Sequence, residues 1–231
     1  MVRLTPEQRS LLRGFEQTAY AIAETVNHTP LLKRATHAYL RTFGAAWVHY
    51  TTRHLQHVWG LEHVQHLDPH RGVLLVSNHR SFFDMYVLSC VLLRRTSFIR
   101  EMYFPVRGEF FYTQPTGVVV NSIMSAMAMY PPVLREQERK AFNPFVVDFI
   151  AGALRRPGAL TGYHPEGTRN KTADPYTLLS ASPGVGQIAH RARPVVIPAF
   201  ILGLGNDLPR QIASNFDGTG EIGRASCMER V

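Results

Sequence analysis

The alternation of apolar and polar positions predicts two helices at the amino-terminal end of the chain. The first begins at Thr5, a capping residue followed by proline, and repeats apolar residues at helical spacing up to residue 26. A break at residues 27–30 precedes a second helix over residues 31–47, which has an apolar, aromatic side and several basic residues. Such a pair can either pack on a core or lie in a membrane interface. The apolar stripe of the first helix comprises Leu11, Leu12, Phe15, Ala19, Ile22 and Val26.

Shorter apolar runs in the rest of the chain predict buried strands that alternate with helices. Residues 73–76 and 159–163 are predicted to be strands that end where polar residues follow. Residues 85–93 and 145–154 are predicted to be buried helices, and the three valines at residues 118–120 are interpreted as a strand. Strands that alternate with helices are typical of the α/β class.

The same patterns divide the chain into three parts. Residues 1–50 form an amphipathic helical segment, and residues 51–220 form one globular domain of a 26.1 kDa chain that is long enough for a sizeable core. Residues 221–231 have neither helical nor strand periodicity. We expect them to be an irregular tail, produced by truncation or by non-native sequence.

Composition narrows the classes of partner. Hydrophobic residues make up 45% of the chain and charged residues 18%, which indicates a globular rather than a disordered protein. The formal net charge of +8 favours anionic partners such as a phospholipid surface or a nucleic acid. We expect no nucleic-acid partner, because the sequence has no zinc-finger motif, RNP motif or lysine-rich tail.

Cysteine content and hydropathy indicate in which cellular compartment the protein is expected. Two cysteines, Cys90 and Cys227, provide no disulfide framework and are typical of a reducing compartment. The histidines do not follow the spacing of metal sites, so we expect neither a metal nor a cofactor. The first residues have no signal-peptide pattern, and no apolar stretch approaches the roughly 20 residues of a membrane-spanning helix. We therefore expect a cytoplasmic protein that contacts membranes peripherally.

His79 lies just beyond the predicted strand at residues 73–76, and Asp84 follows five positions later. On one continuous helix, five residues at roughly 100° each would point these side chains about 140° apart. With His79 in a loop, Ser81 as the helix cap and Asp84 in the first turn, the carboxylate can face the imidazole. An aspartate that accepts the Nδ1 proton leaves the other ring nitrogen free as a base. The alternative interpretation is an ordinary surface or capping pair.

A second polar cluster follows the predicted strand at residues 159–163. Pro165 ends the strand because it cannot donate a ladder hydrogen bond, and Gly167 allows a ligand to approach the backbone closely. Thr168 and Arg169 add a hydroxyl and a planar five-donor group, a combination suited to phosphate. The alternative interpretation is an ordinary exposed Pro-Gly turn.

Together, the two clusters resemble the 1-acylglycerol-3-phosphate O-acyltransferase (PlsC-like glycerolipid acyltransferase) family. HRSFFD at residues 79–84 matches the H-x4-D motif of that family, and PEGTR at residues 165–169 matches its second signature. Residues 194–200 resemble the late V-I-P strand of the family, and the resemblance extends over residues 61–208. It implies an α/β fold: a single domain with a mixed central sheet flanked by helices, preceded by an N-terminal helical pair.

The resemblance also implies an activity. A member of this family transfers a fatty acyl group from acyl-CoA or acyl carrier protein to a lysophospholipid hydroxyl, most typically converting lysophosphatidic acid to phosphatidic acid in phospholipid biosynthesis. His79, oriented by Asp84, is implied to be the base, with no metal or cofactor, and the membrane surface is implied to be a peripheral partner. The residues implied to hold the glycerol-phosphate of the acceptor are Glu166, Gly167, Thr168 and Arg169.

Several positions depart from the family pattern. His164 stands where an aromatic residue usually precedes Pro-Glu-Gly, and Asn170 stands where a serine usually follows the arginine. The middle block, at residues 117–121, lacks the family's arginine, for which Arg107 and Arg135 are candidate substitutes. These departures leave three alternatives open: another lyso-lipid acceptor, a thioester hydrolase, or a non-catalytic membrane- or lipid-binding protein of the same fold.

Overall fold

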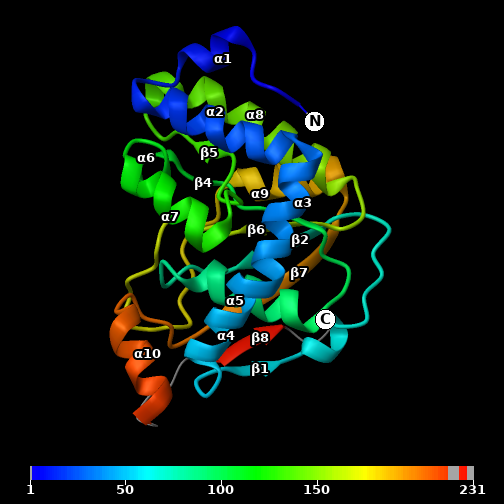
Figure 1. Ribbon diagram of the computed structural model, residues 1–231, viewed down its shortest axis with the longest axis vertical. Coiled ribbons are helices and arrows are strands. Elements are labelled where there is room, and N and C mark those ends of the chain that lie inside the picture. Colours follow the sequence, from blue (N-terminus) through cyan, green and yellow to red (C-terminus); the bar gives the residue numbers. More distant parts are fainter. Residues whose placement is uncertain (1, 218–223, 228–231) are drawn as a thin grey trace.

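The computed structural model describes residues 2–217 and 224–227, and its centre is a six-stranded sheet (Figure 1). In sheet order the strands are β1 (His57–Trp59), β8 (Arg224–Cys227), β7 (Val195–Ile201), β2 (Val73–Ser77), β6 (Ala159–Tyr163) and β3 (Glu101–Tyr103). All neighbouring strands are parallel except β7 and β8, which are antiparallel. A separate parallel ladder joins β4 (Val106–Arg107) and β5 (Pro132–Val133).

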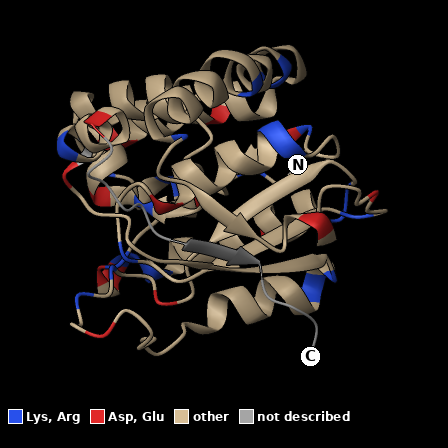
Figure 2. Ribbon diagram, turned by 90° about the horizontal axis from the view of Figure 1, so that it is seen from below, with Lys and Arg blue, Asp and Glu red and all other residues tan. Residues whose placement is uncertain are grey.

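Helices cover both faces of the sheet (Figures 1 and 2). On one face α4 (Ala45–Thr52) packs against α5 (Asp84–Arg95), and on the other α8 (Asn143–Leu154) packs against α9 (Pro183–Ala192). The amino-terminal segment consists of α1 (Pro6–Ser10), α2 (Phe15–His28), α3 (Pro30–Tyr39) and the π-helical turn η1 (Leu40–Gly44). The remaining helical elements are η2 (Leu61–His63), α6 (Gly108–Phe111), α7 (Pro115–Ser125), η3 (Gln137–Phe142) and α10 (Leu208–Asp217). The predicted α/β fold is confirmed.

β2 lies in the interior of the sheet, and four of its five residues are buried. Its Val73 is paired with Leu160 of β6 and with Val195 of β7, so the three parallel strands end at the same edge. α5 approaches β6 closely at Gly162, where a Cβ atom would clash with the side chain of Met85. A glycine at this position therefore allows the helix that follows β2 to pack directly on the sheet.

The amino-terminal helices begin as predicted but differ in detail. Thr5 caps α1 and forms a capping box with Gln8. The predicted single helix is interrupted at Gly14, whose φ of 49° separates α1 from α2. Phe15 and Ile22, which belong to the predicted apolar stripe, are exposed. The residues that α2 buries are Glu16, Ala19, Tyr20, Ala23 and Asn27.

Polar contacts explain why the buried face of α2 keeps Ala19 of the predicted stripe but is rotated away from Phe15 and Ile22. Glu16 forms a buried ion pair with Arg139 of η3, and Asn27 Nδ2 donates to the carbonyl oxygen of Met127 at 2.8 Å. Buried polar groups require partners, so these two contacts fix the rotation of the helix. A count of apolar positions contains no information about partners that lie a hundred residues away.

The predicted strand at residues 118–120 is wrong, because these residues lie within the helix α7. The buried positions of this helix are Gly117, Asn121 and Ser125, which are four residues apart and lie on one face. Because these buried residues are small or polar, a search for apolar residues at helical spacing does not detect the helix. The three valines lie on the other sides of the helix.

The carboxyl-terminal residues also differ from the expectation of an irregular tail over residues 221–231. Residues 224–227 form β8, which is inserted between β7 and β1. A short segment can become a strand without apolar periodicity when neighbouring strands supply its backbone hydrogen bonds. The other residues of that tail lie outside the described part of the chain.

Large apolar side chains are exposed on η1 and α7, and we call Phe43, Val119 and Ile123 the η1–α7 surface. All three are more than half exposed. The two elements are neighbours, and Tyr39 Oη donates to the carbonyl oxygen of Ile123 at 3.0 Å. Exposed apolar groups that gather on one surface indicate a site of interaction. None of the described helices combines the length and apolar character needed to cross a membrane.

Candidate active site

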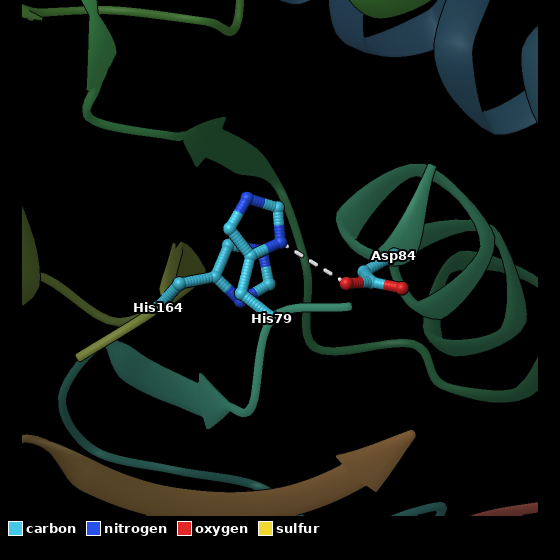
Figure 3. Close-up of side chains that lie close together, drawn as sticks. All are labelled: His79, Asp84 and His164. Atoms are coloured by element: carbon cyan, nitrogen blue, oxygen red, sulfur yellow. Dashed lines mark hydrogen bonds and ion pairs between the residues drawn. The ribbon is translucent and has the colours of Figure 1, made fainter. Parts of the chain in front are cut away.

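His79 and Asp84 are brought together at the carboxyl edge of β2, as the sequence predicts. His79 lies two residues beyond β2, and Asp84 is the first residue of α5. His79 Nδ1 lies 3.0 Å from Asp84 Oδ2, and the Asp84 side chain is fully buried (Figure 3). Because an ionised carboxylate can only accept, Nδ1 carries the proton and Nε2 carries the lone pair.

Asp84 also organises the loop that carries His79. Its Oδ2 accepts hydrogen bonds from the backbone N–H groups of Arg80 at 2.7 Å and Ser81 at 2.8 Å. The predicted cap is met only in part: the Ser81 hydroxyl accepts from the backbone N–H of Phe83 at 3.1 Å and donates to the carbonyl oxygen of Gly205, but α5 begins at Asp84 with Phe83 in the N-cap position. The carboxylate of Asp84 therefore folds back and satisfies two backbone N–H groups of the loop that precedes α5.

His164 is the third member of the site, and the sequence identifies it only as a departure from a family pattern. Its ring stacks on that of His79 with the centroids 4.0 Å apart and the planes at 9° (Figure 3). Its Nδ1–H donates to the carbonyl oxygen of Ser77 at 3.2 Å, at the end of β2. Burial lowers the pKa of His164 to about 4, and the neighbouring His79 contributes in the same direction. At neutral pH the stacked ring is therefore uncharged.

Glu166 contacts the backbone of the loop that carries His79. Its Oε2 accepts from the backbone N–H of His79 at 3.3 Å, and its Oε1 accepts from that of Leu179 at 3.1 Å. The backbone N–H of Asn170 donates to the carbonyl oxygen of His79 at 2.7 Å. Both oxygens of Glu166 are thus engaged by the backbone, and this residue holds the His79 loop against the turn after β6.

The other three residues of the predicted phosphate-binding turn are exposed. Gly167 has a φ of 62°, which favours glycine, and its carbonyl oxygen accepts from the Arg135 guanidinium. Arg169 donates from Nη1 to Asn206 Oδ1 at 2.9 Å, and Thr168 is solvent-accessible beside it. The structure therefore brings Arg135 to the turn. The other candidate, Arg107, is paired with Glu109.

An aromatic cluster lies next to the dyad. Phe82, in the loop between His79 and Asp84, has its ring centroid 5.5 Å from that of Phe110 and 6.0 Å from that of Phe111. Phe111 is buried, whereas Phe110 is half-exposed. An apolar wall beside a polar dyad suits a substrate that has an acyl chain.

His79, Asp84 and His164 also offer possible ligand atoms that lie within 4.8 Å of one another. The two rings are nearly parallel, so their in-plane lone pairs run side by side and do not converge on one ion. Asp84 Oδ2 already accepts three N–H donors, whereas the buried Oδ1 has no hydrogen-bond partner in the described part of the chain. This geometry fits a hydrogen-bonded dyad better than a metal site.

The fold and this site define a class of protein. In the described part of the chain, the His79 side chain hydrogen-bonds to Asp84 and not to a serine or cysteine nucleophile. Such a base, at the carboxyl edge of parallel strands, suits removal of a proton from a substrate hydroxyl or from water. This arrangement suits α/β transferases and hydrolases in which the substrate supplies the nucleophile.

Comparison with known families specifies the class further. The model of the family described as Acyltransferase matches residues 56–202, which is more than half of the chain. The protein therefore belongs to the glycerolipid acyltransferase family. The match includes the His79–Asp84 loop, the turn at residues 165–169 and β7. No curated protein sequence matches the chain.

Proposed function

We propose that the protein is a PlsC-like O-acyltransferase that moves a fatty acyl group from acyl-CoA or acyl carrier protein to the hydroxyl of a lysophospholipid. Lysophosphatidic acid is the favoured acceptor and phosphatidic acid the product. The observation that carries the proposal is the His79–Asp84 hydrogen bond beside the turn that bears Arg169. β2 and β6 are adjacent and parallel, so a base and a phosphate-binding group share one edge of the sheet.

His79 acts as the general base in this reaction. Its Nε2 takes the proton of the acceptor hydroxyl while the oxygen attacks the thioester carbonyl carbon, and a carbon–oxygen bond forms. When the tetrahedral intermediate collapses, the carbon–sulfur bond breaks and the leaving thiolate takes the proton from the imidazolium. Asp84 stabilises the imidazolium between these steps. The acceptor is itself the nucleophile, so the reaction requires no acyl-enzyme.

His164 is a positioning residue for this base. Its ring covers one face of His79, and its hydrogen bond to Ser77 ties that ring to the end of β2. The face of an uncharged aromatic ring attracts the imidazolium that forms during transfer, whereas a charged neighbour would repel it. The low pKa of His164 therefore favours the protonated state of His79 during the reaction.

The turn after β6 binds the phosphate of the acceptor. Arg169 and Arg135 place two guanidinium groups on this turn, and Thr168 adds a hydroxyl. Gly167 permits close approach of the phosphate to the backbone. In this proposal Glu166 supports the site through the backbone of His79 rather than through the acceptor.

The acceptor and the product are lipids, so we place the protein on the cytoplasmic surface of a membrane as a peripheral protein. Its formal net charge of +8 suits an anionic bilayer, and the η1–α7 surface offers exposed apolar side chains for the interface.

A second candidate acceptor is a lysophospholipid with another head group. Residues 117–121 lack the arginine of the family and belong to α7. The phosphate is then held mainly by Arg135 and Arg169, and this set of contacts differs from the family pattern. A panel of lyso-lipids with different head groups distinguishes the two acceptors.

The experiment that tests the proposal is thiol release from a panel of acyl-CoAs and acyl carrier proteins, with and without lysophosphatidic acid. The proteins compared are the wild type, His79→Ala and the matched control His190→Ala, which alters an exposed histidine of α9. We expect acceptor-dependent release that falls at least about 100-fold in His79→Ala and stays unchanged in His190→Ala.

Three results would contradict the proposal. Release that is independent of acceptor but lost in His79→Ala would indicate a thioester hydrolase. Equal release from His79→Ala and wild type would exclude this base. Binding to lipid vesicles without release from any donor would indicate a non-catalytic lipid-binding protein.

A further inference from the structure

A cavity of about 410 Å³ lies at the far end of α5 from the active site. It is bounded by the end of α4, by β1 and by the last turns of α5. Arg94, which lines it, follows Asp84 by ten residues on the same helix, or about 15 Å along the helix axis. β1 runs antiparallel to β2, so Trp59 at its end lies at the opposite edge of the sheet from His79. The cavity is therefore a separate site.

The lining of this cavity contains three arginines and no carboxylate. Arg53 comes from the end of α4, and Arg94 and Arg95 come from the last turn of α5. None of the three forms an ion pair with a residue in the described ranges; the contacts of Arg53 are with His54 and the Tyr50 ring. The described arginines that do form ion pairs are Arg9, Arg13, Arg107, Arg139, Arg156 and Arg191.

The charges of Arg53, Arg94 and Arg95 all act on the side chain of His49. His49, which also lines the cavity, has a lowered pKa because of burial and then because of Arg94, Arg53 and Arg95. The guanidinium groups are therefore close enough to influence the same side chain. Their mutual repulsion has no compensating anion among the described lining residues, and binding of an anion would remove this repulsion.

Stabilisation of the helix dipole is the ordinary reason for basic residues in the last turn of a helix. It applies to Arg94 and Arg95, but it does not explain why Arg53 from another helix lines the same cavity. The cavity also has an aromatic wall, because Trp59 is nearly half exposed and its ring stacks on His57. Such a wall is suited to an apolar or aromatic group rather than to a simple ion.

We propose that this cavity binds an organic phosphate, with the phosphate held by Arg53, Arg94 and Arg95 and the organic part against Trp59. Guanidinium groups bind phosphate oxygens through paired, charge-assisted hydrogen bonds. The volume lies within the range of small-molecule sites. A soluble nucleotide and an anionic lipid head group present the same chemistry. The proposal does not depend on acyl transfer at His79.

The test measures binding of two probes. ADP is titrated calorimetrically, and vesicles of phosphatidylcholine with or without phosphatidic acid are used in co-sedimentation. The proteins compared are the wild type, the double variant Arg94→Gln/Arg95→Gln, and Arg34→Gln, which changes an exposed arginine of α3. Arg169→Gln and His79→Ala are included to detect binding at the active site.

We expect the double variant to bind at least one probe about tenfold more weakly, since it loses charge-assisted hydrogen bonds. Arg34→Gln, which lies outside both sites, should stay within about twofold of the wild type on that probe. A loss confined to ADP identifies a soluble ligand, and a loss confined to phosphatidic acid vesicles identifies a lipid head group. Either result supports the proposal.

Several results would overturn it. If neither probe binds to the wild type, the proposed site is excluded. If Arg34→Gln loses as much binding as the double variant, the probe is attracted by the overall charge of the protein. If Arg169→Gln loses binding and the double variant does not, the probe binds at the active site. Circular dichroism checks folding. If the double variant is unfolded, the single variant Arg53→Gln replaces it; about fivefold weaker binding supports the proposal, and unchanged binding contradicts it.

Discussion

Asp84 combines two tasks in one buried side chain, because it accepts from the His79 ring and from two loop N–H groups. In Asp84→Asn the amide oxygen can still accept from the loop, but the neutral side chain cannot stabilise an imidazolium. We expect kcat to fall by about 10²- to 10⁴-fold, with little change in the KM of the acceptor. Initial rates measure this, and a melting curve checks that the variant is folded. An unchanged kcat would mean that the dyad does not act in the reaction.

The stacked ring of His164 allows a test that separates positioning from folding. His164→Ala removes the ring that covers His79, and we expect kcat to fall about tenfold while the KM of the acceptor stays constant. His164→Phe restores an uncharged ring and should recover most of the activity, although it loses the bond to Ser77. Steady-state kinetics of the two variants and the wild type measure kcat and the KM of the acceptor. An equal fall in kcat in His164→Ala and His164→Phe would show that an uncharged ring over His79 does not support the reaction.

The pKa of His164 also predicts a dependence of stability on pH. Its pKa is about 4 in the folded protein and 6.5 as an ordinary histidine, so the unfolded chain binds more protons between these values. The folded state is favoured fully above about pH 6.5 and loses up to about 3 kcal/mol as the pH falls towards 4. Denaturant unfolding of wild type and His164→Phe from pH 7 to pH 4 measures this. The variant should lose less stability on acidification; identical pH profiles would contradict the prediction.

At the scale of elements, the attachment of α3 to the sheet depends on a buried lysine. Lys33 Nζ donates to Asn27 Oδ1 at 2.6 Å and to the carbonyl oxygen of Met102 at 2.7 Å, and it lies 4.0 Å from the centre of the Tyr103 ring. Burial lowers the pKa of Lys33 to about 7, with Glu101 opposing this change and Arg156 contributing to it. The contact between α3 and β3 is therefore sensitive to pH.

The lowered pKa of Lys33 predicts that stability rises with pH. Between about pH 7 and pH 10.5 the unfolded chain retains a proton that the folded protein has released, so the folded state gains stability across this window and loses it as the pH falls through 7. Denaturant unfolding between pH 7 and pH 9 should show this rise in the wild type and a weaker rise in Lys33→Met. Parallel pH profiles would exclude Lys33 as the cause.

The sequence predicted individual elements well where burial is apolar. β6 has the bounds that its apolar run predicts, and β2 and α8 differ from their predictions by one or two residues. Prediction from the sequence failed for α7 and for the buried face of α2, where small or polar residues face the core. Periodicity detects apolar burial only, and buried polar residues are recognisable only when their partners are known.

At the scale of the whole molecule, the proposed peripheral contact with a bilayer leads to a prediction for the η1–α7 surface. We expect Ile123→Ser and Phe43→Ser together to weaken binding to anionic vesicles about tenfold, because two apolar side chains no longer enter the interface. Val2→Ser removes an exposed apolar residue outside this surface and is the matched control. Vesicle co-sedimentation measures the effect. Equal weakening in Val2→Ser would indicate a general loss of hydrophobicity.

Local sequence patterns were sufficient to predict the α/β class, the two strands that carry the site, and the His79–Asp84 pair. Each of these depends on residues that are close in the chain, where spacing alone sets geometry. Three further features became apparent only from the folded chain: His164 stacks on His79, Glu166 accepts from the backbone of His79, and Arg53 and Arg94 line one cavity. These contacts join segments about 40 to 90 residues apart in the chain, and they depend on strand order and register and on helix packing, which local patterns do not specify.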